Sequence, residues 1–467
     1  MRLAKRMCKF FSFFIVSLFV FSSAYNQENS PFSRYGFGDV YPQQNIASRG
    51  MGGISAAYAS QQAINTYNPA SYSSVNLVTY DFALSIDART LLSKTPVSKY
   101  QSTNFLPSYL QLGVPLSKPG KLNTAALVFG IRPFTRINYA VLEGGKIPYD
   151  SLGVTDSTTA LYNGNGGMNQ VFFGLGKVWK NKKKPNTNLS LGFNFGYEWG
   201  MKYIGSRINF PSDSSYENWY GSNSTDSLHA WGIFFNPGIM ASFTLKEGYD
   251  PLTNSKSDYV LVVGASGTLA QNLKASKDVT RETFFYKSDG DISAIDSVYR
   301  QSDVQGRVKI PYSFNGGFML NKMLVNGYVK KWGFGVDYSF IPWTQFRNYD
   351  QPDQMNDSWF LRAGLEYSPS PIGNKGPLAS GLYRVGIYTG KDGQNADGNS
   401  YQVQALTLGY SFNLRKYRSY DKQFTMINTA FEFGKRGTNI NNVTENFFKF
   451  SLGLSLSDIW FIKRKYD

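Results

Sequence analysis

Long, strict alternation of apolar and polar residues is the feature that most constrains the fold of this chain. In the stretch "FFKFSLGLSLSD", the residues Phe448, Phe450, Leu452, Leu454 and Leu456 are apolar, and those between them are polar or small. Side chains along a β-strand point alternately to its two faces. The stretch therefore predicts a strand with one apolar face and one polar face.

Fourteen segments of the chain carry this alternation, and most are ten or more residues long. They lie near 78–88, 106–117, 123–133, 168–179, 188–202, 230–246, 258–270, 306–321, 329–341, 358–368, 381–390, 402–414, 425–436 and 446–457. Strands of globular proteins have about 5–6 residues, whereas a tilted strand needs about 9–11 to cross a membrane. The lengths favour membrane-spanning strands.

The connections between these segments alternate in length. Most links after even-numbered segments are short, whereas 134–167, 203–229 and 271–305 are long and polar. Short periplasmic turns and longer external loops are typical of outer-membrane barrels, and a sheet in lipid must close on itself or pair with another edge. We therefore predict an all-β, antiparallel transmembrane barrel of 14 strands over 78–467, in the cell outer membrane with both termini periplasmic. The alternative is a secreted, soluble multi-domain β-sandwich, which would not need such long strands.

The first 24 residues have the pattern of an export signal. Arg2, Lys5, Arg6 and Lys9 precede or enter an apolar run that ends near Ala24. The run is short for a retained anchor, so we predict a signal peptide over 1–24 that is cleaved after Ala24. Cys8, the only cysteine of the sequence, lies within it, so the mature chain has no disulfide.

The chain is basic, with a formal net charge of +16 that falls to +12 when the leader is removed. One interpretation is solvated Lys and Arg residues in loops. The other is attraction to anionic lipid headgroups or to another envelope component. We expect outer-membrane lipids and lipopolysaccharide as partners, and nothing beyond the charge suggests nucleic acid.

The segment 25–77 lacks the alternation and is rich in Gly, Ala, Ser and Asn. It is long for a tail and fourteen strands enclose a wide lumen, so we predict an N-terminal plug, or hatch, inside the barrel. Within it, "GMGGISAAYA" and then "INTYNPASYS" resemble the N-terminal hatch of the FadL-type outer-membrane transporters of hydrophobic compounds. "NSPFSRYGFGD" and the ending "WFIKRKYD" resemble a divergent branch of that family found in Bacteroidota.

The resemblance implies a mechanism and assigns Asn68, Pro69 and Ala70 to the Asn-Pro-Ala motif of the hatch. A hydrophobic or amphipathic molecule such as a fatty acid would enter from outside, the hatch would shift, and the molecule would leave through the wall. Proline fixes φ and asparagine forms local hydrogen bonds, so the motif suits a gate. It suits equally a turn that only closes the plug.

Several charged residues occupy the polar face of predicted strands and should point into the lumen. One interpretation is that they pair with one another and hold the plug. The other is that an arginine binds the carboxylate of an acidic ligand. These possible ligand or plug contacts are Arg132, Arg362, Arg384, Asp337 and Glu366.

Two prolines interrupt predicted strands, Pro237 in "FFNPGIM" and Pro311 in "KIPYSF". Proline removes a donor from the strand ladder, so each marks either a harmless bulge or a break in the wall that opens a lateral path.

No catalytic pattern is present in the sequence. His229 is the only histidine, which disfavours a His-based triad or a multi-His metal site, and we expect no enzyme activity, no cofactor and no metal. The predicted function is passive, hatch-gated passage of a hydrophobic or amphipathic small molecule. The alternative is a non-transporting barrel subunit of an envelope complex, in protein secretion or in outer-membrane protein assembly.

Overall fold

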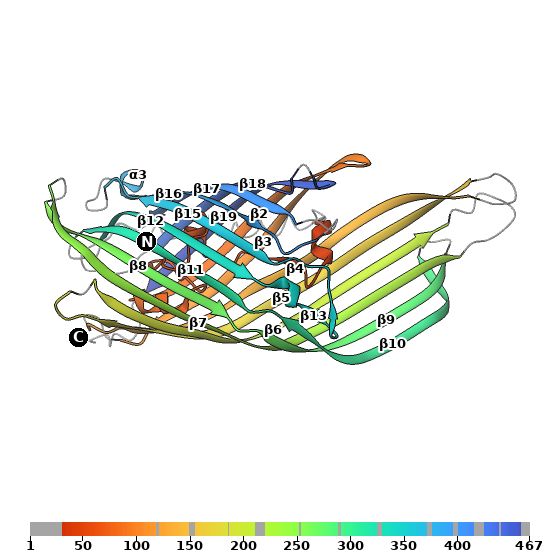
Figure 1. Ribbon diagram of the computed structural model, residues 1–467, viewed down its shortest axis with the longest axis horizontal. Coiled ribbons are helices and arrows are strands. Elements are labelled where there is room, and N and C mark those ends of the chain that lie inside the picture. The colour runs from red at the N-terminus through yellow and green to blue at the C-terminus, as the bar shows by residue number, and fades with distance from the viewer. Residues whose placement is uncertain are drawn as a thin grey trace, which may run out of the picture.

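The computed structural model describes residues 30–117, 121–148, 155–184, 186–210, 220–251, 254–287, 291–324, 329–370, 376–395, 400–414, 425–438 and 440–458 (Figure 1). The predicted signal peptide lies outside these residues. No helix in the described ranges is long and apolar enough to cross a membrane.

Within the described ranges, fourteen antiparallel strands form a closed barrel wall. They are β2 (Val78–Lys94), β3 (Val97–Pro115), β4 (Ala125–Pro148), β5 (Thr155–Lys180), β6 (Asn188–Asn209), β7 (Gly221–Asp250), β8 (Ser255–Thr268), β11 (Ser313–Leu324), β12 (Val329–Ile341), β15 (Ser358–Tyr367), β16 (Leu382–Lys391), β17 (Gln402–Asn413), β18 (Thr425–Arg436) and β19 (Val443–Asp458). The predicted fold class and strand number are confirmed.

The barrel closes where its last strand meets its first. β19 pairs with β2 over sixteen residue pairs, from Val443 opposite Ser93 to Asp458 opposite Val78. We call this junction the closing seam. Since Val78 and Asp458 are opposite each other, the first and last strands begin and end at the same end of the barrel. We call it the short-turn end, because the two longest links between wall strands, 269–312 and 342–357, lie at the opposite end.

The alternation in the sequence corresponds to the two faces of the wall. Phe82, Phe195 and Leu452 point outward and are 38–40% exposed, whereas Asp81 and Glu198 point inward and are fully buried. A wall that is apolar outside and polar inside is the arrangement required in lipid. This protein is an outer-membrane β-barrel.

The three long links predicted as polar loops are largely strand, and that prediction was wrong. In the first link, β4 continues to Pro148 and β5 begins at Thr155. In the second, β6 continues to Asn209 and β7 begins at Gly221. The third link forms a hairpin of β9 (Gln271–Tyr286) and β10 (Ile292–Ile310), in which β9 pairs with β7. Together they build a sheet that projects beyond the barrel, which we call the extended end (Figure 1). Their polar and mixed composition hid the strands, since both faces meet water at the tips.

The segment expected as one strand over 306–321 is in fact two. β10 ends at Ile310 and β11 begins at Ser313, with Pro311 between them. Small elements fill the remaining connections: η4 (Trp343–Gln345), β13 (Arg347–Asn348), β14 (Gln351–Pro352) and α3 (Pro377–Ser380).

Residues 30–77, here called the N-terminal segment, contain only short elements. These are η2 (Pro31–Arg34), β1 (Asp39–Val40), α2 (Ile46–Arg49) and η3 (Pro69–Ser74). The segment contacts inward-facing groups of every one of the fourteen wall strands described above. It thus lies within the ring of strands, surrounded by their polar faces.

Candidate functional site

The Asn-Pro-Ala motif packs against the inner face of β5, β6 and β7 and is fully buried at Asn68 and Ala70. Asn68 caps η3: its Oδ1 accepts a hydrogen bond from the Ala70 N–H at 3.1 Å. Its Nδ2 donates to the carbonyl of Ala56 at 2.6 Å and to that of Ile239 on β7 at 3.2 Å. One amide therefore joins η3, the preceding loop and the wall.

The side chain of Asp337 on β12 binds backbone N–H groups of the N-terminal segment. Its Oδ2 accepts hydrogen bonds from the N–H groups of Ser55 at 2.6 Å and Ala56 at 2.7 Å. Charge-assisted bonds of this kind are roughly twice as strong as neutral ones. The sequence placed Asp337 in the lumen, and the structure assigns it a partner in the segment.

Glycines line the inner wall where the segment crosses it. A Cβ atom at Gly264 of β8 would lie within 3 Å of the Ala56 carbonyl, and one at Gly386 of β16 within 3 Å of the Gly52 nitrogen. The same holds at Gly176, Gly192, Gly364 and Gly409. Backbone therefore packs directly on backbone, and no side chain is available to yield if the segment moves.

Arg49 of α2 and Glu432 of β18 form a buried ion pair that was not predicted from the sequence. The Arg49 Nη2 lies 2.6 Å from Glu432 Oε1, and its Nη1 donates to Ser85 on β2 at 3.0 Å. The side chains are 3% and 5% exposed, so each charge depends on the other. Arg49 lies in a segment without alternation, so no sequence pattern indicated that its side chain would be buried and paired.

Glu366 and Arg384, on neighbouring strands β15 and β16, pair with each other. Arg384 Nε lies 3.0 Å from Glu366 Oε2, and Lys330 Nζ lies 2.6 Å from Glu366 Oε1. Arg384 also donates to Ser411 Oγ at 2.5 Å. These residues form a wall network, with no guanidinium group left over for a ligand.

Arg132 and Arg362 have no carboxylate within ion-pair distance among the described residues. Arg132 donates to Gln170 and Thr66, both at 3.1 Å, and lies over the ring of Phe172. Arg362 donates to Ser339 Oγ at 2.6 Å and lies over the ring of Phe360. Of the predicted ligand contacts, these two are still available.

A cavity of about 250 Å³ lies between the N-terminal segment and the wall. Both arginines line it, and so do many other charged groups: Asp39, Arg49, Arg89, Asp392, Glu432, Arg436, Glu445 and Lys449. The side-chain oxygens of Gln43, Ser266, Gln271 and Asn315 also line it and accept no hydrogen bond from the described protein. Charged groups and apolar side chains, among them Phe134, Ile310 and Trp343, line this cavity together.

The wall is split between β3 and β4. These strands share only six residue pairs, from Leu110 opposite Ile131 to Pro115 opposite Ala126. Beyond Leu110, β3 continues paired with β2, and beyond Ile131, β4 continues paired with β5. Phe105, on the separated part of β3, is 43% exposed on the outward face, so the split begins within the lipid-facing band.

Two prolines and two bulges mark this split. Pro107 precedes the bulged residue Ser108 on β3, and Pro133 precedes the bulged residue Phe134 on β4. Tyr41 bridges both bulges: its N–H donates to the Phe134 carbonyl at 2.9 Å, and its hydroxyl lies 2.9 Å from Ser108 Oγ. The N-terminal segment therefore holds the two sides together where the strands do not. Pro107 and Pro133 were the sequence signal for this split, but the strand breaks were predicted at Pro237 and Pro311 instead.

Pro237 and Pro311 mark a bend. Pro237 lies within β7, where the partner of this strand changes from β9 to β8. Pro311 separates β10 from β11 at the same level. The wall stays joined there, because the Leu269 N–H donates to the Phe235 carbonyl at 3.0 Å and Asn236 Nδ2 to the Gly267 carbonyl at 2.9 Å.

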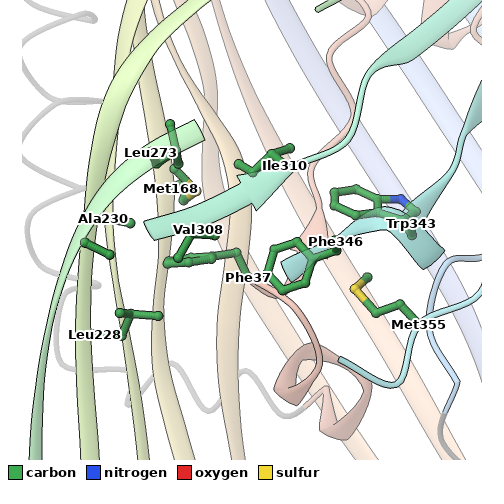
Figure 2. Close-up of a cluster of buried hydrophobic side chains, with 11 residues drawn as sticks. Phe37, Met168, Leu228, Ala230, Leu273, Val308, Ile310, Trp343, Phe346 and Met355 are labelled. Carbon is green, nitrogen blue, oxygen red and sulfur yellow. The ribbon is translucent and has the colours of Figure 1, made fainter. Parts of the chain in front are cut away.

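A hydrophobic cluster covers the lumen at the extended end (Figure 2). Phe37 of the N-terminal segment packs there with Val308 of β10, Trp343 of η4, Phe346 and Met355. The remaining members, from β5, β7, β9 and β10, are Met168, Leu228, Ala230, Leu273, Ala275 and Ile310. The segment is therefore fixed both within the barrel and above it.

No group of three or more His, Cys, Asp or Glu side chains within the described ranges is arranged to hold a metal ion. His229 lies on β7 and is exposed.

The fold resembles that of known outer-membrane transporters of hydrophobic compounds. A FadL homologue from Pseudomonas aeruginosa is 10% identical, with a TM-score of 0.52 over 90% of this chain and 99% of that one. The toluene transporter TbuX of Ralstonia pickettii is 15% identical, with a TM-score of 0.50 over 89% and 98%. A deltaS2 mutant of the monoaromatic hydrocarbon channel TodX is 14% identical, with a TM-score of 0.51 over 90% and 99%. At such identities the likeness establishes the FadL-type fold alone.

The fold and the lumen thus define a FadL-type outer-membrane barrel. No curated protein matches the sequence. The family model BamG matches residues 7–467, nearly the whole sequence, and the chain belongs to the BamG family.

Proposed function

We propose that this protein is a closed-lumen barrel subunit of an outer-membrane complex that secretes or assembles proteins. The observation that carries the proposal is the attachment of the N-terminal segment to every wall strand. Membership of the BamG family points to this alternative from the sequence analysis, whereas the FadL-type fold favours free-standing transport.

The contacts make movement of the segment costly. A shift would separate Arg49 from Glu432 and the Ser55 and Ala56 N–H groups from Asp337, leaving buried charges without partners. It would also expose backbone that now packs on wall glycines. A plug held in this way suits a constant structural role.

Purification in a gentle detergent followed by quantitative mass spectrometry tests the proposal. We expect the protein to co-purify with other envelope proteins at a fixed ratio, and purified protein to form no conducting path in planar bilayers. Recovery of the barrel alone, with no partner at a constant ratio, contradicts the proposal.

The second candidate is the main prediction from the sequence, passive passage of a hydrophobic or amphipathic small molecule. The FadL-type fold and the β3–β4 split favour it, since the split gives a lateral path towards lipid next to Tyr41. Uptake of radiolabelled toluene and of a long-chain fatty acid into proteoliposomes tests this candidate. It requires faster uptake than protein-free liposomes show, and equal rates would exclude passage of these two probes.

A further inference from the structure

The short-turn end carries a concentration of lysines that the proposed function does not yet explain. The basic rim is defined by Lys121, Lys177, Lys180, Lys182, Lys183, Lys184, Lys246 and Lys256. Within the same turns, the described acidic residues outside buried networks are Glu247 and Asp258. The rim is therefore strongly positive.

Hydrogen bonds join these lysines into one surface across three turns. The Lys180 N–H donates to Asn123 Oδ1 at 3.0 Å, which links the β5–β6 turn to the β3–β4 turn. Asn186 Nδ2 donates to Asp258 Oδ2 at 2.6 Å, which links it to the β7–β8 hairpin. The positive charges thus belong to a continuous patch on adjacent turns.

Within the described part of these turns, most lysines of the basic rim have no acidic partner. Among the described residues only Lys184 approaches a carboxylate, that of Glu247, at 3.7 Å with both side chains more than half exposed. Exposed pairs of this kind contribute little. Lys322 and Lys331 nearby differ, since both pair with the carboxylate of Asp250, at 3.0 and 3.4 Å. The charge of the rim is left for an external partner.

The extended end offers a contrast. Lys277 and Arg281 there both pair with Asp226, at 2.8 and 2.7 Å. Burial acts to raise the pKa of Asp226, but the two cations outweigh it and hold the pKa below its usual range. Two cations at that end thus share a carboxylate at 2.8 Å or less, whereas among the described residues no lysine of the basic rim has a carboxylate that close.

The geometry of the β7–β8 hairpin favours a protein partner over lipid. The hairpin extends past the lipid-facing residue Phe243, and from Leu245 to Tyr249 both of its faces are exposed. Leu245 and Tyr249 are 59% and 58% exposed beside Lys246 and Glu247. Exposed apolar and aromatic groups among charges are typical of protein interfaces.

We propose that the basic rim docks an acidic surface of a partner protein on the periplasmic side, with Leu245 and Tyr249 as apolar contacts. This inference rests on the proposed function and specifies the partner chemistry. Opposite charges steer association and choose the partner, and their effect falls with salt.

The test is charge reversal at the tip of the β5–β6 turn, with Lys182→Glu, Lys183→Glu and Lys184→Glu in one full-length chain. The matched control reverses three exposed cations at the other end, Lys99→Glu, Lys391→Glu and Lys435→Glu. At an ionic strength of roughly 0.15 M, we expect the rim variant to retain about tenfold less partner protein than wild type. The control should retain the wild-type amount, and both should fold into heat-resistant barrels in detergent.

Four outcomes separate the possibilities. Loss of a partner only in the rim variant, and loss from wild type at about 1 M salt, supports the inference. Full retention of the partner by the rim variant overturns it while leaving the proposed function intact. Retention of the partner together with weaker binding to vesicles containing phosphatidylglycerol overturns it in favour of lipid. Wild-type protein that purifies alone contradicts the proposed function itself.

Discussion

The closing seam and the β3–β4 split are two junctions of the same wall, and they are held in different ways. β19 and β2 share sixteen residue pairs, whereas β3 and β4 share six. At the closing seam the backbone N–H and C=O groups of the two strands pair with each other. At the split the N-terminal segment takes over, with β1 paired to β4 and Tyr41 bound to both bulges.

The difference shows that the N-terminal segment both occupies the lumen and completes the wall at the β3–β4 split. Unpaired backbone in lipid costs several kcal/mol per group, so a gap in the strand ladder has to be covered. A segment that must stay in place for this reason is poorly suited to leave the lumen as a mobile hatch. We expect the two junctions to respond differently to mutation.

The largest expected difference comes from proline. Ser451→Pro in β19 removes a ladder donor at the seam, where strands pair on both sides, and should prevent the barrel from folding. Thr103→Pro in β3 lies next to the split. Thr103 is an even number of residues from the native Pro107, so its N–H points to the same edge of the strand, and this variant should fold. Heat-dependent mobility on gels measures barrel formation, and equal failure of both variants would contradict the comparison.

The buried ion pair near the seam should give the next largest effect. Arg49→Ala leaves Glu432 buried without its partner, which should lower the free energy of unfolding by roughly 3–5 kcal/mol. Arg384→Ala should cost less, because Glu366 keeps Lys330 at 2.6 Å. Urea unfolding in detergent, followed by tryptophan fluorescence, measures both.

A double variant provides the control. Arg49→Met with Glu432→Gln removes both charges and should recover most of the stability lost by Arg49→Ala. A double variant as unstable as the single one would show that the charge pair is not the cause.

The smallest expected effect is at the split. Tyr41→Phe removes the hydroxyl contact to Ser108 and leaves the backbone bond to Phe134, so we expect a loss of about 0.5–1.5 kcal/mol. The same urea titration measures it. A loss as large as that of Arg49→Ala would mean that the split depends on this single contact.

The alternation at period two was sufficient to predict the wall. It identified which residues face lipid and which face the lumen, and it placed Asp337, Glu366 and Arg384 inside. It failed where strands leave the membrane, because water on both faces removes the contrast between them. The extended end therefore had the composition of loops.

The interior was less predictable, because the partners of lumen residues come from a segment without periodicity. Nothing near Arg49 shows that it pairs with a residue 383 positions later. The split had a visible signal in Pro107 and Pro133, but proline alone does not tell a bend from an opening. Pro237 and Pro311 lie at a bend that stays joined.

The central claim is that the N-terminal segment stays in place while the protein works, and a disulfide tests it most directly. A Cβ at Gly453 on β19 would lie 3.2 Å from that of Ile46, close to the roughly 3.5–4.5 Å that disulfides span. The sequence has one cysteine, within the predicted leader, so Ile46→Cys with Gly453→Cys provides the only thiol pair in the predicted mature chain. The single-cysteine variants are the controls. We predict that the oxidised double variant co-purifies with its partners and supports growth as well as the reduced one. Loss of function on oxidation that is restored by reductant would show that the segment must move, and would contradict the account.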